Sequence, residues 1–468
     1  MNNYKYINKV KIDEHHTDLG NARRLIRDHA TNIKYIPAWQ KWITWDGNRW
    51  KPDEDGEIVR LGLSTVVSIL DDVSSLYREA ANAKSQKKTD KLTEKARELS
   101  SWAMKCQSNS RLNSMITLAQ SQPEAPINHE ELDADHWKLN TLSGLVDLKT
   151  GQLIPHAREH YATKLAPVAY EPSATCPRWL EFLDQIFAGD KELIDFIQKM
   201  VGCMLTGVTV RALFMAWGDG RNGKTTFINV LRKLTGEYSQ QADFTTFLER
   251  DREGAARNDI ARMKGARLVC ASEGPEGKTF NEAIIKQLTG GDRITARYLN
   301  KEFFEFDATW KIFLATNHKP IVKGNDTGIW DRIKLIPFKV KIPLAEVDRE
   351  LPDKLNLELP GILQWAVQGC LKWQTEGLDM PHALEQEVAG YREEMDSIGN
   401  WIAGSCITAP TASSKSSDLY ASYREWSQAA GEFVISQKMF STRLAARGYA
   451  KQKTRSGAIW NGIGLISN

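Results

Sequence analysis

The sequence predicts an α/β fold built on a parallel sheet, with a helical and β-rich region before it and a smaller region of helices and a hairpin after it. Three observations predict this. A short apolar run ending at residue 217 leads straight into a glycine-rich segment and a helical pattern. Two more apolar runs of strand length follow, and the last fifty residues have the order helix, helix, hairpin. Short apolar runs without helical spacing are typical of buried strands.

The glycine-rich segment GDGRNGKTT fits the phosphate-loop pattern G-x-x-x-x-G-K-[ST]. A glycine-rich turn can match this pattern by chance, so the flanking residues decide. The run ALFMAW before it has no helical spacing, whereas TTFINVLRKL after it has apolar residues at helical spacing. We therefore predict a strand, a phosphate loop and a helix, with a nucleotide site made by Gly218, Asp219, Gly220, Arg221, Asn222, Gly223, Lys224, Thr225 and Thr226.

The residue types of this segment suit a nucleoside triphosphate. Glycines let the backbone fold around a phosphate, towards which the loop N–H groups and the helix N-terminus point. Lys224 is expected to reach the β- and γ-phosphates, and the Thr225 hydroxyl is expected to bind Mg²⁺. ATP and Mg²⁺ are therefore the expected cofactors.

Composition narrows the class of protein. The chain has 468 residues, enough for two to four domains, and a net charge of +3. No apolar run approaches the ~20 residues of a membrane span, and the N-terminus is too polar for a secretory signal. The six cysteines are scattered singly, without zinc spacing, which favours a reducing compartment. We expect a cytoplasmic protein with no membrane partner, and expect His15 and His16 to lie on the surface.

The region before the phosphate loop is expected to have two parts. Residues 1–125 have mostly helical patterns, including a charged helix over 81–105, and one hairpin is expected where Asp46-Gly47 separates two aromatic-rich runs. The tryptophans there could stack on bases, but a small core is the favoured interpretation for Trp39, Trp42, Trp45 and Trp50. Residues 126–175 form a β-rich connector with Ser-Gly and Thr-Gly turns.

The remaining boundaries follow from helix and linker signals. Residues 176–345 hold two amphipathic helices and the nucleotide core, and residues 346–409 form a helical extension. The segment PTASSKSSD, residues 410–418, has the composition of a linker. Residues 410–468 then make the last predicted domain.

Three polar residues beyond the phosphate loop fall at positions that nucleotide chemistry requires. Glu273 ends the apolar run ARLVCASE, where a carboxylate orients water or metal. Asn317 ends WKIFLATN, where an amide can hold the γ-phosphate or the attacking water. Arg332 lies just before another apolar run. We predict catalytic roles for all three beside Lys224.

Taken together, these motifs resemble the superfamily 3 helicases, and within them the phage/plasmid primase family, which includes the poxvirus-type primase-helicases. The resemblance covers nearly the whole chain, through DADHWKLNTLSGLVDLKTGQL, CPRWLEFLDQIF, GDGRNGKTT, IKQLTGGDRITAR, LATNHKP, GIWDRI and DLYASYREW. It implies an AAA+-like P-loop ATPase core, a hexameric ring of identical subunits, and 3′-to-5′ movement on single-stranded DNA. The partners it implies are single-stranded and forked DNA and a separate primase, and the cell it implies is a bacterial host.

The resemblance also assigns residues. It makes Gly218 to Thr225 motif A, Glu273 the end of motif B with a role at the metal, and Asn317 the sensor of motif C. Arg332 matches the arginine finger, which acts on a neighbouring subunit. The extra motif of the superfamily covers residues 286–297, and a channel hairpin that touches DNA follows it. The implied DNA contacts are Lys286, Arg297, Tyr298, Asn300 and Lys301.

This chain departs from the family pattern at two places. Ser272 stands before Glu273 where relatives often have a second acid, which removes one possible metal ligand. Asp331 stands where many relatives have an arginine, so Arg332 alone is available as the finger.

The segment DADH, residues 133–136, could be taken for the paired carboxylates of a polymerase site. In the family it falls in the β-rich segment, and members that prime carry a catalytic domain upstream of the region matched here. The chain begins too late to contain that domain, so we expect no priming site in it.

The C-terminal region is expected to form a winged-helix-like domain that binds DNA. Basic residues on a helix and a wing suit phosphate contacts, although a solvated surface or a protein-docking domain remains an alternative. The residues concerned are Lys438, Arg443, Arg447, Lys451, Lys453 and Arg455.

The predicted function is that of an ATP hydrolase and ring-forming DNA helicase in the replication of a phage, plasmid or other mobile element. One alternative is an ATP-regulated initiator or loader that assembles on origin DNA without processive unwinding. A small-molecule P-loop kinase is a second alternative, but such an enzyme needs neither a channel hairpin nor a basic C-terminal domain.

Overall fold

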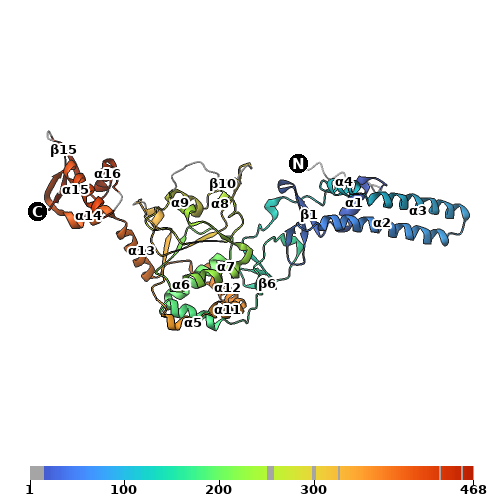
Figure 1. Ribbon diagram of the computed structural model, residues 1–468, viewed down its shortest axis with the longest axis horizontal. Coiled ribbons are helices and arrows are strands. Elements are labelled where there is room, and N and C mark those ends of the chain that lie inside the picture. Colours follow the sequence, from blue (N-terminus) through green and yellow to red (C-terminus); the bar gives the residue numbers. More distant parts are fainter. Residues whose placement is uncertain are drawn as a thin grey trace.

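The computed structural model describes residues 15–249, 258–297, 302–324, 327–431, 434–454 and 457–466. The chain is elongated, with a helical N-terminal part at one end, a central sheet covered by helices, and a small C-terminal region at the other end (Figure 1). Within these residues, no helix combines the length and the apolarity that crossing a membrane requires.

The N-terminal part combines four helices with a small antiparallel sheet, as the sequence predicted. The helices are α1 (Asp18–His29), α2 (Glu57–Ala81), α3 (Gln86–Cys106) and α4 (Asn109–Ala119), and the strands are β1 (Ile33–Ile36), β2 (Lys41–Trp45) and β3 (Trp50–Pro52). The predicted hairpin is confirmed: Trp45 pairs with Trp50 around a four-residue loop. In that loop the Asp46 side chain accepts hydrogen bonds from the backbone N–H groups of Asn48 and Arg49, at 2.8 and 2.9 Å.

The tryptophans of this region divide between core and surface. Trp42 and Trp50 are buried, which confirms a core role for these two. Trp39 is 42% exposed, because it lies in the short turn that links β1 to β2. The two histidines expected on the surface, His15 and His16, are exposed.

The connector is β-rich, as predicted. It forms an antiparallel sheet of β4 (Lys138–Thr141), β5 (Gly144–Asp147) and β6 (Gln152–Ile154). The two predicted amphipathic helices follow as α5 (Pro177–Ile186) and α6 (Lys191–Met204).

The central sheet has five parallel strands in the order β13-β7-β12-β9-β8. Their bounds are β7 (Leu213–Trp217), β8 (Ser239–Gln241), β9 (Leu268–Ser272), β12 (Lys311–Thr316) and β13 (Ile333–Pro337). The strands predicted over ALFMAW, ARLVCASE and WKIFLATN are therefore confirmed. Because β12 inserts between β7 and β9, the three strands that carry the predicted site are neighbours.

Both faces of this sheet are buried, because alternate side chains of each strand point to opposite sides. Phe214 and Phe313 belong to one core with α5, α6, α7 (Lys224–Thr235) and α12 (Leu359–Glu376). Met215 and Leu314 belong to a second core with α8 (Asn258–Ala261), α9 (Glu282–Gly290) and α13 (His382–Glu394). An antiparallel hairpin of β10 (Ile294–Ala296) and β11 (Phe304–Phe306) projects between β9 and β12 in the chain.

Three helices remain to be named. They are α10 (Thr327–Trp330), which precedes β13, α11 (Leu351–Leu357), which precedes α12, and α14 (Ser397–Ser405), which follows α13. The C-terminal region consists of β14 (Cys406–Lys415), α15 (Ser416–Ala429), α16 (Gln437–Ala446), β15 (Ala450–Thr454) and β16 (Gly457–Leu465). The predicted order helix, helix, hairpin is present. The winged-helix assignment and the domain boundaries stay predictions.

The prediction of a linker over residues 410–418 is wrong. This segment forms the second half of β14 and the start of α15, and β14 pairs with β16 in an antiparallel sheet of order β14-β16-β15. The pairing shifts register between Thr408 and Ser413, which accommodates Pro410 at the edge of the sheet. The Ser- and Thr-rich composition reflects exposed side chains on an edge strand rather than an unstructured connection.

Candidate functional site

The phosphate-loop segment lies between β7 and α7, as predicted. Gly218 follows β7 with φ +155°, and a Cβ built there would lie 2.2 Å from the carbonyl oxygen of Phe338. Gly223 caps α7 with φ +85°, and a Cβ there would lie 2.7 Å from the Ile186 side chain. Close packing therefore requires a glycine at both positions. The loop between them leads from the end of β7 to the N-terminus of α7, whose N–H groups suit a phosphate.

Lys224 lies inside this loop. Its side chain is buried, and its ammonium donates to the carbonyl oxygen of Gly218, to that of Asp219 at 3.0 Å and to Asn222 Oδ1 at 3.2 Å. Burial lowers the pKa of Lys224, and the nearby Asp219 charge opposes that shift. A desolvated cation held only by neutral oxygens is electrostatically suited to an anionic ligand.

The neighbouring residues of the loop have distinct surroundings. Asn222 is buried, and its amide donates to the Phe338 carbonyl oxygen at 2.9 Å, which ties the loop to the end of β13. Thr225 is exposed in the first turn of α7 and Thr226 is half-buried. The Thr225 hydroxyl is thus accessible at the position that the pattern assigns to a metal ligand.

The ends of three neighbouring strands meet at this edge of the sheet. Ala315 of β12 is level with Ala216 of β7 on one side and with Ser272 of β9 on the other. Adjacent strands lie about 4.8 Å apart, so the residues after each strand emerge side by side. Asn317 therefore emerges between the phosphate loop and Glu273, as an amide between a lysine and a carboxylate.

Glu273 has an unusual backbone. Its φ is +65°, its side chain is exposed, and its N–H donates to the Ala315 carbonyl oxygen at 3.1 Å. The left-handed region disfavours residues with a Cβ, and such residues concentrate at functional sites. The left-handed residue ends β9 at Ser272 and changes the direction of the chain directly after the strand.

Arg332 lies at the other end of the strands, just before β13 and level with the start of β7. Its carbonyl oxygen accepts a hydrogen bond from the N–H of Leu213, the first residue of β7, at 2.7 Å. The phosphate loop begins five residues later, about 16 Å away at 3.3 Å per residue. The half-buried guanidinium donates to Thr289 Oγ1 at 3.1 Å and to the Gly328 carbonyl oxygen. The structure does not bring Arg332 together with the phosphate loop of its own chain.

With this geometry in place, two family comparisons are informative. Residues 22–188 match the family described as D5 N terminal like, and residues 216–332 match a family of unknown function, DUF5906. The "Putative helicase L207/L206" of Acanthamoeba polyphaga mimivirus is 24% identical over 460 residues, which cover 90% of this chain and 47% of that protein. The matched domains and the viral relatives support a D5-like helicase family for this chain.

Other relatives match smaller parts. "Putative helicase 184R" of Invertebrate iridescent virus 6 is 24% identical over 51% of this chain and 26% of its own length. "Putative primase C962R" of African swine fever virus is 26% identical over 45% of this chain and 23% of its own length. The chain thus spans less than half the length of these relatives. Among solved structures, the apo C-terminal region of NrS-1 aligns with TM-score 0.48 and 10% identity, over 82% of this chain and 78% of that one.

The hairpin that this D5-like chain was predicted to carry is partly described. Strands β10 and β11 form its two arms, and Lys286 is half-buried on the preceding helix α9. Arg297 follows β10, with its guanidinium 4.7 Å from the centre of the exposed Phe303 ring. Three predicted DNA contacts, Tyr298, Asn300 and Lys301, lie outside the described residues.

The C-terminal cations fall into two groups. Lys438 on α16 and Lys451 and Lys453 on β15 are exposed. Arg443 and Arg447, two further predicted DNA contacts, interact with residues from distant parts of the chain. Arg443 donates to the Lys323 carbonyl oxygen, and Arg447 forms an ion pair with Asp396. The sixth residue, Arg455, lies outside the described residues.

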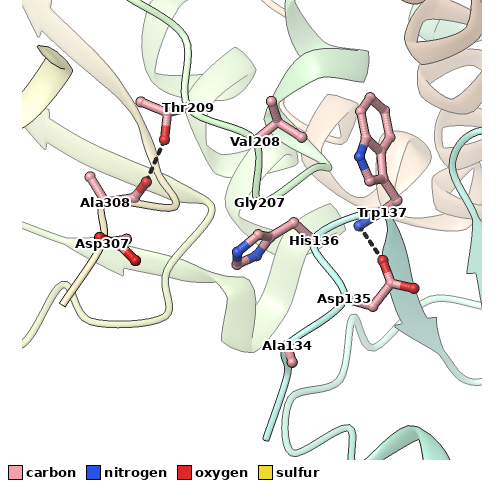
Figure 2. Close-up of a pocket in the computed structure, with 9 residues that line it drawn as sticks. All are labelled: Ala134, Asp135, His136, Trp137, Gly207, Val208, Thr209, Asp307 and Ala308. Atoms are coloured by element: carbon pink, nitrogen blue, oxygen red, sulfur yellow. Dashed lines mark hydrogen bonds between the residues drawn. The ribbon is translucent and has the colours of Figure 1, made fainter. Parts of the chain in front are cut away.

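Ala134, Asp135 and His136 of the DADH segment line an open depression of about 640 Å³ (Figure 2). Asp133 accepts hydrogen bonds from the N–H and hydroxyl of Thr163, and Asp135 accepts one from the Trp137 N–H at 3.0 Å. Partial burial, together with the charges of Arg267 and Lys311, lowers the pKa of His136. The Asp135 carboxylate thus shapes a local turn, and that of Asp133 joins this segment to Thr163. Among the described residues, no group of three or more acids, histidines or cysteines is arranged around a common point.

The sequence analysis missed one cation beside the nucleotide edge. The Lys319 ammonium lies 4.3 Å from the centre of the Trp217 ring, directly before the phosphate loop, and 2.8 Å from Glu394 Oε1 on α13. Its position two residues after Asn317 was the available signal. Sequence alone could not show that the chain brings α13 back to this edge.

Proposed function

We propose that the protein is an ATP-driven DNA helicase that acts in the replication of a phage, plasmid or other mobile element. The observation that supports this most is the meeting of Lys224, Asn317 and Glu273 at one edge of the parallel sheet. The relatives support it through their names, which are helicase and primase names from viruses. The scattered cysteines support a cytoplasmic location and the phage/plasmid resemblance supports a bacterial host, whereas these relatives come from viruses of eukaryotes.

The proposed division of labour follows from the AAA+-like arrangement. Lys224 neutralises phosphate charge, and the Thr225 hydroxyl and the Glu273 carboxylate supply the oxygen ligands that Mg²⁺ prefers. The metal, when bound, neutralises charge that develops on the phosphates. Glu273 also accepts a proton from the attacking water, and Asn317 orients that water or the γ-phosphate.

A ring of subunits completes the proposed site. Because Arg332 lies about 16 Å along the sheet from its own phosphate loop, it serves a neighbouring subunit more readily than its own. Its guanidinium there stabilises charge on the transferring phosphoryl group. Family resemblance supplies the hexameric state, the 3′-to-5′ direction, a channel hairpin that moves single-stranded DNA, and a separate primase as partner.

The test is strand displacement. Purified protein with ATP and Mg²⁺ is mixed with a forked duplex carrying a 3′ or a 5′ tail, and the Lys224→Ala variant serves as the control. We expect unwinding of the 3′-tailed fork by the parent protein only. ATPase activity stimulated by DNA without strand displacement would indicate the initiator or loader instead. ATP turnover that ignores DNA would indicate a small-molecule kinase.

A further inference from the structure

The helices α2 and α3 form a long antiparallel hairpin that extends away from the rest of the molecule (Figure 1). They have 25 and 21 residues, which is about 30 to 37 Å at 1.5 Å per residue. Their facing side chains are apolar and buried, among them Ile69 and Val73 of α2 and Ala96 and Leu99 of α3. The hairpin is therefore a packed arm whose tip lies far from the nucleotide site.

The tip of this arm, residues 78–95, is strongly basic. It holds three acidic residues and six basic ones, so its net charge of +3 equals that of the entire chain. The acidic residues are Glu79, Asp90 and Glu94, and the basic residues are Arg78, Lys84, Lys87, Lys88, Lys91 and Lys95. The rest of the chain is therefore neutral in sum, and this segment carries the net positive charge.

Three lysines of the tip lie along one side of α3. Lys88, Lys91 and Lys95 recur at intervals of three and four residues, which is the spacing of one helix face. These three are exposed, as is Lys84 in the turn before α3. Within the described part of the chain, none of them forms an ion pair, whereas the acidic Asp90 accepts a hydrogen bond from Gln86 at 2.8 Å.

Helix stability does not explain this placement. Lys87 and Lys88 lie in the first turn of α3, which has no acidic residue. The helix dipole disfavours cations in a first turn. A solvated surface helix would place glutamates there, so the sequence holds positive charge at this point against the preference of the helix.

We propose that the tip of the α2–α3 hairpin binds the phosphate backbone of duplex DNA. Residues 78–95 include no aromatic side chain, so the tip itself has nothing on which unpaired bases could stack. Lysine ammonium groups on a helix face bind phosphates without reading sequence. The inference rests on the proposed function, for which duplex DNA ahead of the fork is the substrate. The arm then holds the duplex at a distance from the channel.

The test measures binding of a short blunt duplex by fluorescence anisotropy over a salt series, without nucleotide. The variant K88Q/K91Q keeps the helix-forming character of both positions and removes two charges. Its matched control is K41Q/K105Q, which removes two exposed charges outside the tip, Lys105 lying at the other end of α3. A second variant, E79Q/E94Q, removes two exposed acids from the same tip. Circular dichroism checks that every variant stays folded.

We expect K88Q/K91Q to bind the duplex several-fold more weakly, with a log–log salt slope lower by about 0.9 for each lost phosphate contact. The control should bind like the parent, and E79Q/E94Q should bind more tightly. Unchanged affinity and slope for K88Q/K91Q would overturn the proposal. So would an effect confined to single-stranded DNA, duplex RNA or phosphatidylserine vesicles, which are measured in parallel. Because no ATP is used, this outcome is independent of whether the protein unwinds a fork.

Discussion

Lys319 and Glu394 form an ion pair that joins the loop carrying Asn317 to helix α13, with Nζ 2.8 and 2.9 Å from the two carboxylate oxygens. The same helix reaches that loop through the buried Tyr391, whose hydroxyl donates to the Pro320 carbonyl oxygen. The Tyr391 ring also meets Trp330 edge to face, two residues before Arg332. Helix α13 thus contacts the elements that carry both the predicted sensor and the predicted finger.

We predict that Lys319→Gln slows ATP hydrolysis several-fold while ATP binding changes little. The substitution releases the sensor loop from α13 but leaves the phosphate loop intact. Steady-state kinetics should show a lower kcat with a similar KM. The control is Glu387→Gln. Glu387 also lies on α13, and its substitution removes the ion-pair partner of the exposed Lys339. If both variants lose the same activity, the Lys319 contact has no special role.

Two substitutions should distinguish ATP binding from ATP hydrolysis. Lys224→Ala should abolish ATPase activity, because the phosphates lose the desolvated cation in the loop. Glu273→Gln should bind ATP but turn over about 10²–10⁴ times more slowly, because the water loses its proton acceptor. Binding of a fluorescent ATP analogue and phosphate release check the two steps. Turnover by Glu273→Gln at the parental rate would contradict the role given to this carboxylate.

Arg332 should act between subunits. Arg332→Ala alone should bind ATP yet hydrolyse it ~10³–10⁵ times more slowly. Mixing it with the inactive Lys224→Ala variant should restore measurable ATPase activity, because some interfaces then pair an intact lysine with a neighbour's intact arginine. Thr289→Val is the control, since it keeps Arg332 and removes a hydrogen-bond acceptor of the guanidinium together with the hydroxyl's own bond to the Ile285 carbonyl oxygen. Exchange of subunits without any recovered activity at any ratio would show that Arg332 does not act on a neighbour.

Two glycines of the phosphate loop should differ sharply. Gly218→Ala should destabilise the fold by more than about 1 kcal/mol and prevent ATP binding, because φ is +155° and the Phe338 carbonyl oxygen leaves no room for a Cβ. Gly220→Ala should leave stability unchanged, since a Cβ there meets nothing within 4 Å. Thermal unfolding and nucleotide titration measure both effects. Equal melting temperatures for the two variants would contradict the packing argument.

Much of the nucleotide edge could be predicted from sequence because its information is local. Each strand is a short apolar run, and the residue that follows it, such as Glu273 or Asn317, is polar. The order of the strands is not local. Nothing in the chain order says that β12 inserts between β7 and β9, which decides that Asn317 lies between the loop and the carboxylate.

The wrong linker prediction has the same origin. Residues 410–418 have the composition of a linker, and their pairing depends on β16, about fifty residues further along the chain. Arg443 and Arg447 have the charge of DNA contacts, and their partners Lys323 and Asp396 are supplied by distant segments. Local composition reports which groups a segment carries, whereas tertiary packing decides which of them remain accessible.

The backbone of Glu273 has a consequence for how this sequence can change over evolutionary time. A glycine would adopt its φ of +65° with less strain, so the chain gives up roughly 1–2 kcal/mol to keep a carboxylate there. Selection for stability alone therefore pushes this position towards glycine, and only selection for hydrolysis opposes it. In a library of variants screened for solubility without any demand for ATP turnover, position 273 should drift to glycine sooner than Asn317 drifts to any residue.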